Sequence, residues 1–168
     1  MKKLDLKAMV TCAALIAAAI VLSRFLSINA WNLKIGLTFL PVFIAAYLYG
    51  PNGGELAGGI AAFIGAILFP IGAYFPGFTL TCVITGAVYG LLLHKKQAPL
   101  GILIAIGFVQ LGCGLLVNTY WISVLHGSPF TALLGTRSVQ CLIMIPVEFI
   151  VIGAMSRLLA RHKASLTA

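Results

Sequence analysis

The chain has 168 residues, of which 61% are hydrophobic and only 8% are charged, and it carries a formal net charge of +8. A water-soluble protein of this size carries roughly 25% charged residues, because polar side chains must cover its core. The composition therefore excludes a soluble domain. The small number of basic residues, 11 Lys and Arg, argues against nucleic acid as a partner. We expect a protein of the lipid bilayer, in which ~20 apolar residues per span leave no length for a soluble catalytic domain.

Long uncharged stretches separated by turn signals predict an all-α integral membrane protein with six transmembrane helices. A Gly-Pro-Asn-Gly-Gly turn at 50–54 separates the second helix from the third. Pro70 and Pro76 divide the uncharged stretch 56–93, which is too long for one span, and the turn at 126–129 divides the next such stretch. The predicted helices cover residues 6–26, 37–49, 56–69, 78–93, 100–125 and 133–159, within one domain of residues 1–168.

Six spans place both chain ends on one side of the membrane, and the excess of Lys and Arg in cytoplasmic segments selects that side. The basic residues of the terminal side are Lys2, Lys3, Lys7, Lys95, Lys96, Arg157, Arg161 and Lys163. Those of the opposite side are Arg24, Lys34 and Arg137. The bias predicts a multi-pass protein of the plasma membrane with both ends in the cytoplasm.

Three cations stand near the external ends of predicted helices, on the side that should be poor in positive charge. These are Arg24, Lys34 and Arg137. An ionised side chain at the centre of a span costs about 2.5 to 3.5 kcal/mol, so a single cation near a helix end commonly extends to the lipid headgroups. Three of them together indicate instead an electropositive, outward-facing mouth for an anionic solute.

A set of aromatic and polar side chains is predicted at a similar depth. Flat rings can stack on the faces of a heteroaromatic ligand while amides and hydroxyls bond its edges. The alternative for the aromatic residues is the belt found at any membrane interface. Arg137 and Gln140 share a helix face because they are three residues apart. The candidates are Tyr74, Phe75, Phe78, Thr79, Asn118, Trp121 and Gln140.

Glu148 is an acidic residue in the middle of the last predicted span, two residues after Pro146. A buried glutamate must be paired, solvated or neutral. A structural role and a proton-coupling role are both open for it at this point, and its pairing partner is not evident from the sequence.

Small residues recur at four-residue spacing in three predicted helices. In the first helix they are Ala13, Ala14, Ala17 and Ala18. Such A-x-x-x-A spacing gives a smooth face for close helix packing, either within the protein or against another protein. Gly54 with Gly58, and Gly86 with Gly90, have the same spacing and are most simply explained by internal packing.

Several chemistries have no signature in the sequence. There is no G-x-x-x-x-G-K-[ST] phosphate loop, no zinc-protease motif and no nucleophile elbow. The four cysteines lack metal-ligand spacing. We therefore predict no enzymatic activity, no cofactor and no metal, so that any active transport would draw its energy from a partner.

Several short stretches, taken in their order along the chain, resemble the substrate-binding S components of energy-coupling factor (ECF) vitamin transporters, and among them the folate-binding members. The most distinctive stretch is Tyr-Phe-Pro-Gly-Phe-Thr at 74–79. The others are 23–25, 33–36 with Pro41, 49–54, Asn118-Thr119 with Trp121, and 127–137. Together they span nearly the whole chain.

The resemblance implies a bacterial membrane protein that binds one vitamin from outside. It also implies a complex with a transmembrane T component and two ATPases, in which the alanine face of the first helix docks on the T component. Folate or a folate derivative is the implied ligand, because folate combines a flat pterin, an apolar benzoyl group and a glutamate with two carboxylates.

A specific arrangement of folate follows as a hypothesis. Tyr74, Phe75, Phe78 and Trp121 would wall the rings, while Thr79, Asn118 and Gln140 would bond the pterin edge. Arg24, Lys34 and Arg137 would pair with the carboxylates, although one arginine can stack on a ring instead. Three alternatives stay open: an S component for another vitamin, a proton-coupled secondary transporter that uses Glu148, and a structural membrane subunit without a ligand.

Overall fold

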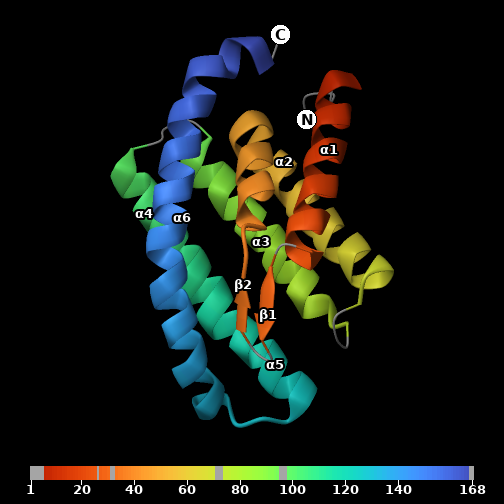
Figure 1. Cartoon of the computed structure of the whole chain (residues 1–168), viewed down its shortest axis with the longest axis vertical. Helices are drawn as coiled ribbons and strands as arrows, with labels where there is room; N and C mark the ends of the chain where they lie inside the picture. Colours follow the sequence, from red (N-terminus) through yellow and green to blue (C-terminus); the bar gives the residue numbers. More distant parts are fainter. Residues whose placement is uncertain (1–5, 26, 31–32, 71–73, 95–97, 167–168) are drawn as a thin grey trace.

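The computed structural model describes residues 6–25, 27–30, 33–70, 74–94 and 98–166, with side chains for all of these except 28–30, 33–35 and 161–166. The molecule is a bundle of long helices with one short hairpin (Figure 1). Its elements are α1 (Leu6–Arg24), β1 (Ile28–Ala30), β2 (Leu33–Ile35), α2 (Phe39–Leu68), α3 (Pro76–Leu93), α4 (Pro99–Gly107), η1 (Phe108–Val117), α5 (Asn118–His126) and α6 (Phe130–Leu166).

The predicted helices are present, but the chain joins some of them and adds a hairpin. The predicted helices 37–49 and 56–69 follow one another within α2, where Gly50, at φ 75°, interrupts the helical backbone before Pro51. The elements α4, η1 and α5 follow one another without a gap from residue 99 to 126, and η1 is a π-helix. The all-helical prediction is confirmed, and the described residues add one short antiparallel pair, β1 and β2, which supplies backbone hydrogen bonds between α1 and α2.

Four helical stretches in the described part of the chain are long and apolar enough to cross a membrane. They are Leu6–Arg24, Pro76–Leu93, Pro99–His126 and Phe130–Ala160. Large apolar side chains face outward, among them Leu91, Leu142 and Ile150, which are each about 70% exposed. An exterior of this kind suits lipid, whereas a soluble protein avoids large exposed apolar patches.

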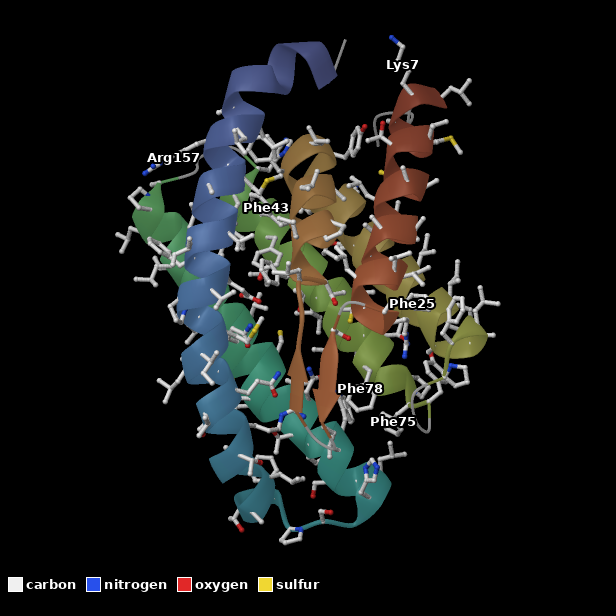
Figure 2. All side chains as sticks on the ribbon, viewed as in Figure 1. Lys7, Phe25, Phe43, Phe75, Phe78 and Arg157 are labelled. Atoms are coloured by element: carbon white, nitrogen blue, oxygen red, sulfur yellow. The ribbon has the colours of Figure 1, made fainter. Side chains whose placement is uncertain are left out.

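The start of α1 and the end of α6 lie at the same end of the bundle (Figure 1). Figure 2 shows Lys7 and Arg157 toward this end, whereas Phe75 and Phe78 lie in the other half of the molecule. The hairpin and the turn between α5 and α6 also lie away from the termini. The aromatic candidates are therefore separated from the basic ends of the chain.

Glycines bring α2 and α3 into direct backbone contact. A Cβ added to Gly54 would lie 2.3 Å from the carbonyl oxygen of Gly86, and one added to Gly90 would lie 2.3 Å from the Cα of Pro51. No larger residue fits at such distances, so the predicted role of these glycines in internal packing is confirmed. Beside this contact lies the apolar core, with Phe43, Tyr47, Tyr89, Leu93 and Ile106 among its most deeply buried side chains.

Candidate ligand-binding cavity

A cavity of about 490 Å³ opens among α1, α2, α3, η1, α5 and α6. Eight of the ten residues predicted to bind a substrate line it, although they come from four separate segments of the chain. These eight are Arg24, Tyr74, Phe75, Phe78, Thr79, Asn118, Arg137 and Gln140. The fold thus gathers most of the predicted site around one space.

Phe75 forms the aromatic wall together with Phe78, and the backbone at the start of α3 sets its direction. Because it precedes Pro76, Phe75 is held in an extended conformation, at φ −128° and ψ 124°. Its ring centroid lies 6.3 Å from that of Phe78, with a T-shaped arrangement. The two rings come from the same end of α3, as Figure 2 shows.

Trp121 supports this wall from behind rather than lining the cavity. Its ring centroid is 5.2 Å from that of Phe75, and its indole Nε1 donates a hydrogen bond to Thr81 Oγ1 at 3.3 Å. Gly77 makes the approach possible, since a Cβ there would lie 2.6 Å from the indole ring. Trp121 therefore positions Phe75, a role that the sequence did not distinguish from direct contact with a ligand.

Tyr74 and Thr79 are joined across the start of α3. The Tyr74 hydroxyl lies 3.1 Å from Thr79 Oγ1, and both residues line the cavity. Tyr74 is 41% exposed, so this bond lies where the cavity meets the outside. The bond joins Tyr74 to the first turn of α3.

The two arginines of the site have buried nitrogens that no described residue bonds. Arg24, at the end of α1, lies over Gly65, where a Cβ would come within 3.2 Å of its Nε. This Nε is buried without a hydrogen-bond partner in the described part of the chain. The same holds for Nη1 of Arg137, a residue on α6 that is only 7% exposed. Each guanidinium group therefore has an N–H donor that no described residue accepts.

Two further polar atoms of the cavity lining are buried without a partner among the described residues. They are Thr38 Oγ1, next to the start of α2, and Asn118 Oδ1, at the start of α5. Leaving a buried donor or acceptor unpaired costs about 1 to 3 kcal/mol. Four such atoms around one cavity make it a candidate site for a polar ligand, and the two guanidinium donors among them favour anionic groups on that ligand.

Lys34 cannot be placed in the same way. Its backbone lies in β2, opposite Asn29 of β1. The side chain lies outside the described part of the structure, so its assignment to the site stays a prediction.

The structure adds a buried acidic group that the site prediction omitted. Glu148 is 2% exposed and lines the cavity. Its Oε1 accepts a hydrogen bond from Gln110 Nε2 at 2.7 Å, and its Oε2 accepts one from the Tyr89 hydroxyl at 3.2 Å. The sequence pointed to Glu148 as unusual, but its partners lie 38 and 59 residues away and carry no signal of their own.

Comparison with known proteins decides the family. Residues 7–155 match the family described as the ECF transporter substrate-specific component. The chain belongs to this family. The S component resembles the folate transporter FolT of Clostridium novyi (strain NT), with 36% identity over 153 residues that cover 90% of this chain and 88% of the relative. FolT of Leuconostoc mesenteroides is 33% identical, over 87% of this chain and 82% of the relative.

Solved structures agree with this assignment. The S component superposes on a crystal structure of FolT bound with folic acid with a TM-score of 0.87 and 28% identity, covering 92% of this chain and 97% of that one. The S component for biotin from an ECF-type ABC transporter shares the fold, with a TM-score of 0.72, 20% identity and 90% of each chain covered.

Membership of this family makes the protein a substrate-binding component of a transporter in the plasma membrane and not an enzyme. A self-sufficient transporter that carries protons on Glu148 is therefore no longer an explanation of that residue.

Proposed function

We propose that this S component binds folate or a folate derivative from outside the cell. The observation that carries the proposal is the cavity itself, which combines an aromatic wall with buried polar atoms of Arg24, Asn118 and Arg137 that no described residue bonds. The similarity to FolT along most of both chains supports the same ligand. A different vitamin is the second candidate, because the fold is shared with a biotin S component.

The chemistry of the lining suits the parts of folate. Phe75 and Phe78 offer ring faces for the pterin and the benzoyl group, and Thr79, Asn118 and Gln140 supply donors and acceptors for polar edges. Arg24, Lys34 and Arg137 pair with the two glutamate carboxylates in this arrangement, since guanidinium groups bind carboxylates through charge-assisted hydrogen bonds.

The decisive experiment identifies the ligand without assuming which vitamin it is. The protein is expressed alone, purified in mild detergent and denatured, and the small molecules that it releases are identified by mass spectrometry. A folate at close to one molecule per protein is the expected result. Another vitamin would keep the family and replace the ligand, and a protein that releases nothing and gives no signal in a folate titration would refute the proposal.

We further propose that the chain crosses the membrane six times, with both ends in the cytoplasm. Support comes from the shared location of the α1 start and the α6 end, and from the division of α2 at Gly50. A fluorescent protein fused to the C-terminus should therefore fold and fluoresce in the cytoplasm. An alkaline phosphatase fused at the same point should be inactive, and the reverse result would contradict the orientation.

The alanine stripe of α1 is proposed as the docking surface for a transmembrane T component, which in turn couples to two ATPases. Ala13, Ala14, Ala17 and Ala18 are all exposed, while Cys12 and Ala19 of the same helix are buried. A smooth exposed stripe permits close helix contact with a partner. The match of residues 7–155 to the ECF transporter substrate-specific component supports such a partner.

A further inference from the structure

The cavity-facing side of α6 carries an ordered series of chemical groups. Arg137, Gln140, Met144 and Glu148 all line the cavity, at spacings of three, four and four residues. Such spacing places them on one face of the helix. At 1.5 Å of rise per residue, the arginine and the glutamate are about 16 Å apart along α6. One wall of the cavity therefore has a cation at one end and a carboxyl group at the other.

The carboxyl group of Glu148 is held in a fixed direction by two neighbours. Gln110 Nε2 and the Tyr89 hydroxyl each donate to a different oxygen, at 2.7 Å and 3.2 Å. Gly114 leaves room for this arrangement, because a Cβ there would lie 3.2 Å from Gln110 Oε1. Gln110 and Tyr89 thus act as positioning residues for the carboxylate.

The fixed carboxylate retains capacity for further donors. An ionised carboxylate has about four lone-pair sites and only accepts hydrogen bonds. Among the described residues, Gln110 and Tyr89 occupy two of these sites, and each oxygen keeps another. Since burying a charge without hydrogen bonds is costly, a ligand that brings two neighbouring N–H groups would complete the shell of Glu148.

We propose that Glu148 determines the specificity and the direction of the bound ligand by accepting two hydrogen bonds from the N3–H and the 2-amino group of a pterin. This inference rests on the proposed folate function and adds the residue that recognises the pterin ring. The glutamate moiety of folate then points along α6 toward Arg137. An imide edge, such as that of a flavin, presents two carbonyl oxygens and is repelled by the same carboxylate.

The test compares folic acid with its 2-desamino analogue, which lacks one of the two donors. Titration of the wild-type protein is expected to give at least tenfold tighter binding of folic acid, since the analogue leaves a buried carboxylate lone pair unmatched. In Glu148→Gln, which keeps the shape and presents an amide, the preference for folic acid should fall to about threefold or less. Glu55→Gln is the matched control, because this carboxylate lies outside the cavity lining, and it should keep the full preference.

The outcomes separate the two proposals. Equal binding of both compounds by the wild-type protein would overturn the role of Glu148 and leave the folate function intact. Binding of neither compound would overturn the folate function itself. A preference that survives in Glu148→Gln would assign the pterin donors to another acceptor. If Glu148→Gln does not fold, Glu148→Asp keeps the charge but withdraws the carboxylate by one methylene, and an unchanged preference in that variant would overturn the inference.

Discussion

The two sides of α3 have different roles, because one packs against α2 and the other lines the cavity. Toward α2, Gly86 and Gly90 bring two backbones into contact, so this interface is complete in the protein alone. Toward the cavity, α3 presents Phe78, Thr79 and Thr85 to a space whose other walls contain polar atoms without a partner in the described part of the chain. The packing contact and the proposed ligand-binding surface therefore lie on separate faces of one helix. Substitutions should therefore affect one property without the other.

The largest effect is expected at the glycine interface. In Gly86→Ala the new Cβ would lie 2.1 Å from the carbonyl oxygen of Gly54, so α2 and α3 must separate. Overpacking of this kind should cost about 3 kcal/mol or more. Thermal unfolding and size-exclusion chromatography in detergent measure it.

Gly153→Ala is the matched control, because no described residue beyond the local helix backbone comes within 4 Å of the added Cβ. It should leave stability unchanged or raise it by less than ~1 kcal/mol, as expected from helix propensity. Equal stability of the two variants would refute the backbone contact between α2 and α3.

The outer surface of α1 should behave differently from both faces of α3. Ala17→Trp places a large side chain on the exposed alanine stripe, so uptake by the complete transporter should be abolished while the isolated protein binds folate as before. Vitamin uptake in cells and titration of the purified protein measure the two properties. Leu142→Trp, at an exposed position of α6, is the control and should transport normally. Normal uptake by Ala17→Trp would show that the stripe does not contact a partner.

On the cavity side, Arg137→Ala should weaken folate binding at least tenfold, because a charge-assisted hydrogen bond contributes about 1.5 to 3 kcal/mol. The stability of the ligand-free protein should not fall, since a buried guanidinium nitrogen that no described residue bonds is itself unfavourable. Isothermal titration and thermal unfolding test these points. Arg157→Ala, toward the opposite end of the molecule, should change neither (Figure 2). Unchanged affinity in Arg137→Ala would remove this arginine from the site.

The smallest effect is expected where Tyr74 meets Thr79. Tyr74→Phe removes one partly exposed hydrogen bond within the protein, whose net contribution of about 0.5 to 1.5 kcal/mol limits the loss of affinity to about tenfold at most. Folate titration at constant salt measures it. Tyr120→Phe, at a more exposed position outside the cavity lining, should bind as the wild type does. A loss as large as that of Arg137→Ala would mean that Tyr74 bonds the ligand directly.

Local sequence patterns were sufficient to predict the helices and the kinds of residue at the site. Hydrophobic length and the Gly50-Pro51 turn located the helices, because these signals depend only on neighbouring residues. The aromatic run at 74–79 and the cations Arg24 and Arg137 were out of place for lipid, which marked them as functional candidates. They line a common cavity in the structure.

What the sequence could not supply were relations between distant segments. The rotation of each helix about its axis decides that Tyr89 reaches Glu148, 59 residues away, and that Trp121 lies behind Phe75 instead of facing the cavity. The hairpin of β1 and β2 depends likewise on pairing across a turn. The sequence by itself determined a membrane protein with a polar, aromatic site. Only the tertiary structure decided which side chains share that site, because packing among helices, and not local periodicity, sets their directions.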